Sequence, residues 1–140
     1  MNQTINVLLV EDSEEDAWLI QREFEISGLN ASITRVQSSS ALNEALDRQQ
    51  WDIVISDYRM PRFSGMTALA IVRTRQPGVP FILLSGAIEE RVANVAIMTG
   101  ATAFFKKGDM DQLMPLVKRE LQTASKRKRV DDASDHSDHH

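Results

Sequence analysis

Several short apolar runs of this sequence end abruptly in residues that could do chemistry. These end residues are Glu11 and Asp12, Asp57, Ser85, and the pair Lys106 and Lys107. The first two belong to a six-residue stretch, 11–16, that holds five acids. In open α/β sheets, functional groups gather beyond the carboxyl ends of the strands. If the apolar runs are such strands, three acids, a hydroxyl and an amine share one crevice.

Three carboxylates brought close together repel each other, so one must be protonated or a cation must neutralise them. Hard oxygen ligands without cysteine suit Mg²⁺, which binds carboxylate and phosphate oxygens and retains several waters. Lys107 could pair with an anion, and Ser85 could donate a hydrogen bond to it. A carboxylate beside a metal ion, a hydroxyl and an amine can accept a phosphoryl group, so the residues predict an aspartyl phosphate at Asp57.

The apolar periodicity predicts the elements that position these residues. The predicted strands cover residues 5–10, 31–36, 51–56, 79–84 and 101–105. The predicted helices cover residues 14–27, 38–49, 66–75, 89–99 and 109–124. Ser13 and Asp109 are the expected N-caps of the first and last helix, with Asp16 as a weak capping-box partner of Ser13, and Gly28 and Gly100 are expected to end helices.

Strands that alternate with helices indicate βαβ units and a parallel sheet. The strands are continuous apolar runs, which is typical of a sheet covered by helices on both faces. We therefore expect a doubly wound α/β fold, although residue spacing alone leaves the strand order open.

Composition limits the possible classes of protein. The 140 residues, with 42% hydrophobic, 26% charged and a net charge of −4, predict one globular domain. The lack of cysteine excludes disulfide scaffolds, thiolate zinc sites and cysteine nucleophiles. Residues 1–60 hold 11 acids and 4 bases, whereas residues 61–124 hold 5 acids and 8 bases. Much of the acid excess should therefore surround the crevice.

No apolar run approaches the roughly 20 residues of a membrane span, and no signal peptide is recognisable, so a cytoplasmic protein is expected. Residues 125–140 lack apolar periodicity and are predicted to be a disordered charged tail after a domain at 1–124, which leaves no room for an output domain. The basic run 126–129 could contact nucleic acid, but a solvated helix end is favoured. The histidines of the tail, His136, His139 and His140, are interpreted as incidental.

Four segments together resemble the response-regulator receiver domain of bacterial two-component signalling, over residues 5–124. They are Val7–Asp12, Asp57–Pro61 followed by Ser64–Gly65, Leu84–Gly86, and Gly100–Lys107. The resemblance implies a flavodoxin-like (βα)5 fold with strand order 2-1-3-4-5. It also implies Mg²⁺ as cofactor and a sensor histidine kinase or histidine phosphotransfer protein as the phosphodonor.

The resemblance assigns roles by position. Asp57 corresponds to the phosphoacceptor, Asp12 to a direct Mg²⁺ ligand, Glu11 to a ligand through water, and the Arg59 backbone carbonyl to a further ligand. The remaining matches are Ser85 as switch hydroxyl, Phe104 as switch aromatic and Lys107 as the motif lysine. Lys107 is preferred over Lys106 because it is seven residues after Gly100 and because neighbouring strand residues face opposite sides.

The sequence departs from the family pattern at three positions. Gly108 replaces the usual proline, Phe104 lacks a tyrosine hydroxyl, and Ser85 replaces the commoner threonine. Two further positions are candidates for tuning dephosphorylation: Arg59, two residues after Asp57, and Ala87, two residues after Ser85.

The main hypothesis is a stand-alone receiver whose only chemistry is its own phosphorylation and dephosphorylation, and which switches the surface of its fourth helix, fifth strand and fifth helix. One alternative is a receiver-like docking module that is not phosphorylated. A second is a Mg²⁺-dependent phosphatase with an aspartate nucleophile, although such enzymes generally carry a second aspartate where this chain has Arg59. Nucleic-acid binding through residues 126–129 is a third and less favoured alternative.

Overall fold

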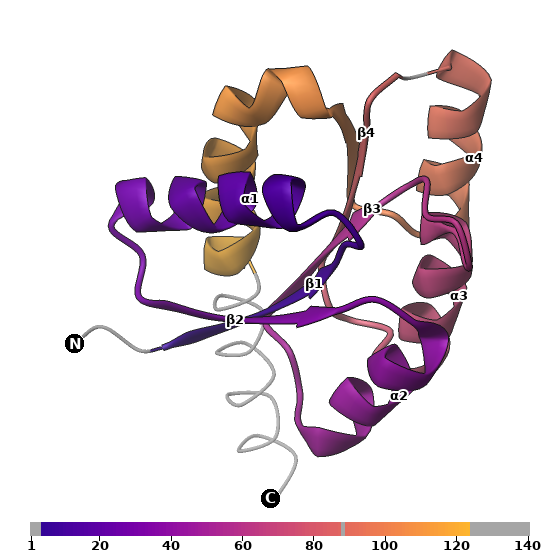
Figure 1. The fold of residues 1–140 in the computed structure, drawn as a ribbon, viewed down its shortest axis with the longest axis horizontal. Helices are drawn as coiled ribbons and strands as arrows, with labels where there is room; N and C mark the ends of the chain where they lie inside the picture. Colours follow the sequence, from indigo (N-terminus) through magenta and orange to yellow (C-terminus); the bar gives the residue numbers. More distant parts are fainter. Residues whose placement is uncertain (1–3, 88, 124–140) are drawn as a thin grey trace, which may run out of the picture.

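The computed structural model describes residues 4–87 and 89–123. Five parallel strands form one sheet in the order β2-β1-β3-β4-β5, the flavodoxin-like arrangement (Figure 1). The strands are β1 (Ile5–Val10), β2 (Ala31–Val36), β3 (Ile53–Asp57), β4 (Phe81–Ser85) and β5 (Ala103–Lys106). The helices are α1 (Glu14–Ser27), α2 (Ser39–Arg48), α3 (Gly65–Arg75), α4 (Glu90–Thr99), the 3₁₀ helix η1 (Lys107–Gln112) and the helical residues 113–123.

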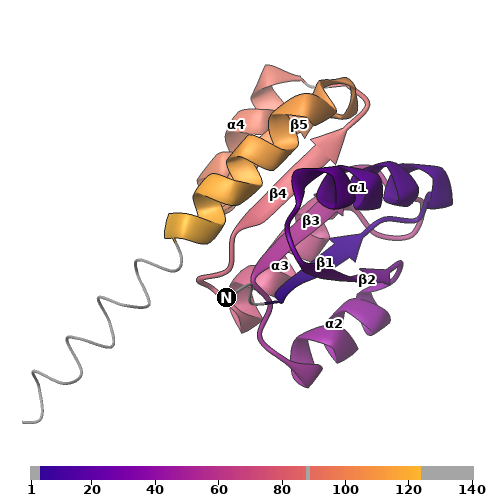
Figure 2. The ribbon, with the colours of Figure 1, turned by 90° about the vertical axis from the view of Figure 1, so that its left-hand side faces the viewer.

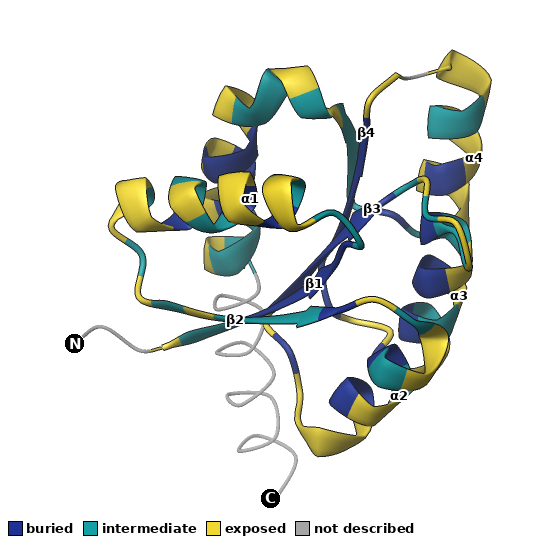
Figure 3. Cartoon of the chain, in the orientation of Figure 1, coloured by how far each residue is buried: buried dark blue, intermediate teal, exposed yellow. Residues whose placement is uncertain are grey.

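The helices form two layers, one on each face of the sheet. Alternate residues of a strand face opposite sides, so Leu8 and Val54 pack with α2, α3 and α4, whereas Val7 and Ile53 pack with α1 and residues 113–117. Figure 2 views the side that carries α1 and the helical residues 113–123. Figure 3 shows the buried strands at the centre and exposed residues along the outer helix faces. The expected doubly wound fold is confirmed.

Local side-chain and glycine contacts fix where α1 begins and ends. Ser13 Oγ accepts a hydrogen bond from the Asp16 backbone N–H at 3.2 Å, which satisfies a helix donor that would otherwise lack a partner. Gly28 ends α1 in the left-handed region at φ 81°, a conformation that costs glycine little. The predicted capping box is wrong in one respect, because the Ser13 backbone N–H donates to Glu11 Oε2 and not to Asp16.

Three strands begin and end one or two residues later than predicted. Trp51 precedes β3 because its backbone N–H donates to Gln76 Oε1 at 3.0 Å and its indole N–H to the Ala45 carbonyl. Pro80 precedes β4, and a proline has no N–H to donate to a strand partner. At the other end of these strands, Asp57 and Ser85 are the last residues, and they pair with Leu84 and Lys106 of the neighbouring strands.

The segment after β5 also differs from the prediction. Asp109 lies inside η1 with φ −101° and ψ 36°, and the residue that precedes η1 is Lys106, so Asp109 does not cap the last helix. A turn of 3₁₀ helix fits this position because Gly108 has a low preference for the α-helix. The predicted tail at 125–140 lies outside the described residues. Within 4–87 and 89–123, none of the helices combines the length and apolar character that a membrane crossing requires.

Candidate functional site

The turn between β1 and α1 places two acids at the carboxyl edge of the sheet. Glu11 is fully buried, and its backbone N–H donates to the Val36 carbonyl at 3.1 Å. The guanidinium of Arg35 donates to the Glu11 carbonyl at 2.8 Å and to the Asp12 carbonyl at 2.9 Å. Arg35 therefore fixes the turn. This role of Arg35 was not predicted, and the available signal was a single charged residue in a strand whose other residues carry no charge.

Three carboxylates meet at this edge. Glu11, Asp12 and Asp57 each offer one oxygen, and these oxygens lie within 4.8 Å of one another. Asp57 is the last residue of β3 and is only 7% exposed. Glu11 Oε1 accepts no hydrogen bond from any described residue although it is buried. A buried oxygen without a donor is costly, so this atom fits a site that receives a cation or a water molecule.

One ammonium group lies among these acids. Lys107 Nζ is 2.5 Å from Asp16 Oδ2, 3.3 Å from Glu11 Oε1 and 3.4 Å from Asp57 Oδ1. Lys106, the last residue of β5, is exposed. The structure therefore brings Lys107 and not Lys106 to the carboxylates. The side chain of Asp16 was not expected here, since its sequence position indicated only a helix-start acid.

Burial and mutual repulsion shift the pKa values of this cluster. Burial and, to a smaller extent, the neighbouring Asp57 carboxylate raise the pKa of Glu11 to about 7, although Lys107 and the hydrogen bond from the Ser13 backbone N–H act in the opposite direction. Burial by itself would lower the pKa of Lys107, but the carboxylates of Asp16, Glu11 and Asp57 together raise it above its usual value. Lys107 is therefore a permanent cation, whereas Glu11 changes charge near neutral pH.

Ser85 ends β4 with its side chain buried. Its hydroxyl donates to the Ala87 carbonyl at 2.8 Å, and it accepts a long hydrogen bond from the Ala87 backbone N–H at 3.4 Å. The hydroxyl is thus bonded within its own loop. It must leave the Ala87 carbonyl before it can donate to a group on Asp57.

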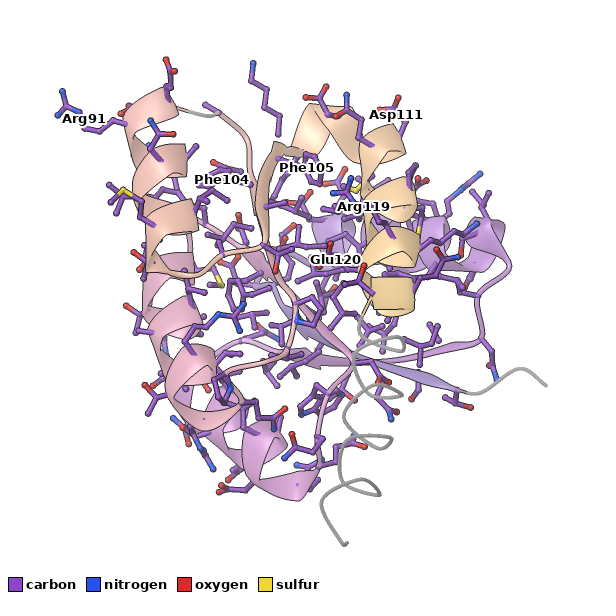
Figure 4. The ribbon with its side chains drawn as sticks, turned by 180° about the vertical axis from the view of Figure 1, so that it is seen from behind. Arg91, Phe104, Phe105, Asp111, Arg119 and Glu120 are labelled. Atoms are coloured by element: carbon purple, nitrogen blue, oxygen red, sulfur yellow. The ribbon has the colours of Figure 1, made fainter. Side chains whose placement is uncertain are left out.

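The two phenylalanines of β5 face opposite sides of the sheet (Figure 4). Phe104 packs with the cluster on the side of α2, α3 and α4, and Phe105 with the cluster on the side of α1. The Phe104 ring is half-buried, and its centroid lies 5.4 Å from that of Tyr58 with an interplanar angle of 47°. Tyr58 follows Asp57 directly, so this ring pair connects the acid cluster to β5.

The mouth of the site is open beside Asp12. Arg59 is exposed, and its backbone N–H donates a long hydrogen bond of 3.4 Å to Asp57 Oδ1. A cavity of about 490 Å³ lies next to the acids and is lined by Asp12, Gln37, Ser38, Met60, Pro61 and Arg62. The acid cluster is therefore accessible from this side through Asp12.

Comparison with known proteins shows the family. A sequence model of the response regulator receiver domain matches residues 7–118, so the chain belongs to this family. The DNA-binding transcriptional regulator NtrC of Klebsiella pneumoniae is 28% identical over 114 residues, which cover 81% of this chain and 24% of NtrC. The probable transcriptional regulatory protein TcrX of Mycobacterium tuberculosis is 33% identical over 95 residues, which cover 66% of this chain and 40% of TcrX. The chain spans about a quarter of the length of the NtrC relatives.

Solved structures agree with the fold. The receiver domain of a putative LuxO repressor from Vibrio parahaemolyticus has a TM-score of 0.82 at 24% identity and covers 91% of this chain and 98% of that chain. The receiver domain of the sensor histidine kinase PA1611 from Pseudomonas aeruginosa has a TM-score of 0.73 at 21% identity, and the match covers 86% of this chain and 99% of that chain. That domain is described with a magnesium ion coordinated in its active-site cleft.

Proposed function

We propose that this receiver domain accepts a phosphoryl group on Asp57 from a partner phosphohistidine. The observation that carries the proposal is the meeting of three carboxylates with one ammonium at the carboxyl edge of the sheet. A docking module that is never phosphorylated would gain nothing from burying such a cluster, because uncompensated buried charge destabilises the fold.

The donor set fits Mg²⁺. Carboxylate oxygens are preferred by this ion, and the buried Glu11 Oε1 accepts no hydrogen bond from the described residues, its nearest cation being Lys107 Nζ at 3.3 Å. In the proposal, Asp12 and Asp57 would hold the ion directly, Glu11 would hold it through water, and the Arg59 backbone carbonyl would add a further ligand. Bound Mg²⁺ would supply neutralising charge to phosphoryl oxygens. The magnesium ion described for the PA1611 receiver supports this assignment.

The side chains then have distinct tasks. A carboxylate oxygen of Asp57 attacks phosphorus, the phosphorus–nitrogen bond to the donor imidazole breaks, and the leaving nitrogen keeps the electron pair and takes up a proton. Lys107 is close enough to Asp57 for its ammonium to pair with the developing charge on the phosphoryl oxygens. Ser85 would donate its hydrogen bond to the same group after it leaves Ala87.

The phosphorylated state would change a protein-binding surface. When Ser85 turns toward the phosphoryl group, the half-buried Phe104 can rotate into the space beside it. The affected surface comprises α4, β5 and the helical residues 113–123, where Figure 4 marks Arg91 on α4 and Arg119 on the last helix. A phosphoryl group shifts this equilibrium only by its different contacts in the two states, typically about 1–3 kcal/mol.

The proposal extends to the effect of the switched surface on other molecules. The switched surface would control a protein partner or relay the phosphoryl group in the cytoplasm. The NtrC relatives are described as DNA-binding regulators, but the match covers only their receiver-like quarter, so we do not extend DNA binding to this chain. In this proposal the protein is a phosphoacceptor and not a turnover enzyme.

Arg59 and Ala87 are proposed to tune the lifetime of the phosphoryl group. Arg59 is exposed at the mouth and could cover the group, while Ala87 is small and leaves access for water. Arg59→Asn should change the dephosphorylation rate, because it exchanges a covering cation for an amide that can orient an attacking water. The measurement is the decay of radiolabelled protein after removal of the donor, and an unchanged decay would exclude a role for position 59.

The direct test of the proposed acceptor is Asp57→Ala. This variant should lose labelling by a phosphohistidine donor while its circular dichroism and unfolding midpoint show an intact fold. Asp52→Ala is a suitable control, because Asp52 is an exposed acid at the opposite end of β3. Labelling that persists in Asp57→Ala would refute the assignment. Turnover of a small phosphate ester by the wild type would instead favour the phosphatase alternative.

A further inference from the structure

Lys107 lies closer to Asp16, which is outside the set of three carboxylates Glu11, Asp12 and Asp57, than to Glu11 or Asp57. Its ammonium lies 2.5 Å from Asp16 Oδ2, compared with 3.3 Å from Glu11 Oε1 and 3.4 Å from Asp57 Oδ1. Charge-assisted hydrogen bonds are usually about 2.7–2.9 Å long. Among the described residues, Lys107 therefore has its closest partner, and the acceptor of its hydrogen bond, in Asp16 on α1, and it lies farther from the proposed phosphoacceptor.

The side chain of Asp16 is free to make this contact because it has no capping task. Its backbone N–H bonds to Ser13 Oγ, and its carboxylate is 30% exposed and points to Lys107. Asp16 is not among the three carboxylates that could share a metal ion. It is thus a fourth acid at the site, one that contacts the ammonium without contributing to the candidate metal cluster.

This inference rests on the proposed function, in which Lys107 must pair with a phosphoryl group on Asp57. An ammonium has three donors, and Lys107 already shares its charge among Asp16, Glu11 and Asp57. A phosphoryl group on Asp57 must compete with these carboxylates for the same ammonium. The negative charge of Asp16 also opposes the approach of another anion. Both effects weaken the binding of a phosphoryl group at Asp57.

We propose that Asp16 is a positioning residue that retains the Lys107 ammonium in the unphosphorylated protein and competes for it with the phosphoryl group on Asp57. The competition reduces the affinity of the site for the phosphoryl group. Asp16 thereby helps to set how strongly the phosphoryl group must bind before Lys107 moves from Asp16 toward Asp57.

The test measures the binding of beryllofluoride, a mimic of the phosphoryl group, to the full chain at saturating Mg²⁺. The dissociation constant is obtained from amide chemical shifts in an NMR titration. Asp16→Asn should lower it by about two- to fivefold, which is the range expected for one partly exposed ion pair. Asp16→Ala should act in the same direction, so the test does not depend on the folding of one variant.

Glu15→Gln is the matched control. Glu15 lies in the same first turn of α1, is exposed and makes no ion pair among the described residues. Glu15 carries the same charge as Asp16 and lies at the same end of the helix dipole. Because salt screens the charge of an exposed side chain, Glu15→Gln should leave the dissociation constant for beryllofluoride unchanged at physiological salt. Asp16→Glu keeps the charge within reach of Lys107 and should stay near the wild-type value.

A second comparison separates positioning from general charge. In the background of Lys107→Gln, Asp16→Asn should no longer improve binding, because the contact for which Asp16 competes is gone. An improvement that persists in this background, an equal improvement in Glu15→Gln, or weaker or unchanged binding in Asp16→Asn would each overturn the inference. If wild-type protein binds no beryllofluoride at all, the proposed function fails instead.

Discussion

Gly65, the first residue of α3, links the core to the proposed phosphoacceptor. A Cβ at this position would lie 2.5 Å from the Asp57 carbonyl oxygen, 2.6 Å from Leu83 Cδ2 and 2.9 Å from Tyr58 Cα. Two of these atoms belong to backbone, and Leu83 is fully buried. Since ordinary contacts begin at 3.4 Å, the closest atom must move by about 0.9 Å.

The expected cost of Gly65→Ala follows from this overlap. Overpacking a buried site costs typically about 1–3 kcal/mol, and the smaller conformational freedom of alanine in the unfolded chain returns about 0.4–1 kcal/mol. The free energy of unfolding should therefore fall by about 1–2 kcal/mol. For a domain of this size, that corresponds to a decrease in Tm of about 4–8 °C.

Urea unfolding followed by circular dichroism measures this difference. Gly78→Ala is the matched control, because Gly78 is exposed and a Cβ there meets no atom within 4 Å. It should unfold at the wild-type midpoint or slightly above. Gly65→Ala should also be phosphorylated more slowly at a temperature where it is folded, because the Asp57 backbone must shift. Equal stability of Gly65→Ala and wild type would refute the packing argument.

Two further predictions concern a buried acid and a buried amide. The pKa of Glu11 in the folded state, about 7, exceeds its ordinary value of 4.5, so the folded protein holds this proton more tightly. The free energy of unfolding, measured with urea in EDTA, should therefore fall as the pH rises from about 4.5 through 7, and Glu11→Gln should lose this fall; the same pH dependence in both proteins would contradict the argument. Gln76 accepts a hydrogen bond from the Trp51 backbone N–H and donates to the Leu46 and Gln49 carbonyls. Gln76→Ala should lower the free energy of unfolding by about 1–3 kcal/mol, because it leaves buried polar groups unpaired, and an unchanged urea midpoint would contradict that.

The fold was largely predictable because its signals are local. Continuous apolar runs such as 5–10 identify strands covered on both faces, and Ser13 and Gly28 mark where α1 begins and ends. The strand order was not predictable from spacing, because the positions of apolar residues along the chain do not say which strands pair with each other. It came from the resemblance to the family, and the sheet topology confirms it.

Contacts between residues far apart in the chain could not be predicted from the sequence. Gln76 is an ordinary polar residue near a helix end, yet it is buried and holds the backbone before β3. Asp16 and Lys107 are 91 positions apart, and nothing local distinguishes Asp16 from the exposed acids beside it. This pair depends on how the fold brings the start of η1 to the first turn of α1, which the local pattern does not encode.

The central claim is that Asp57 accepts a phosphoryl group with the help of a divalent cation. The measurement that tests it most directly is the intact mass of the full chain after incubation with a small phosphodonor, with Mg²⁺ and with EDTA, followed by peptide mapping. We predict the addition of one phosphoryl group on Asp57 that requires Mg²⁺ and is absent from Asp57→Ala. No mass increase in the presence of Mg²⁺, or a phosphoryl group mapped to another residue, would contradict the claim.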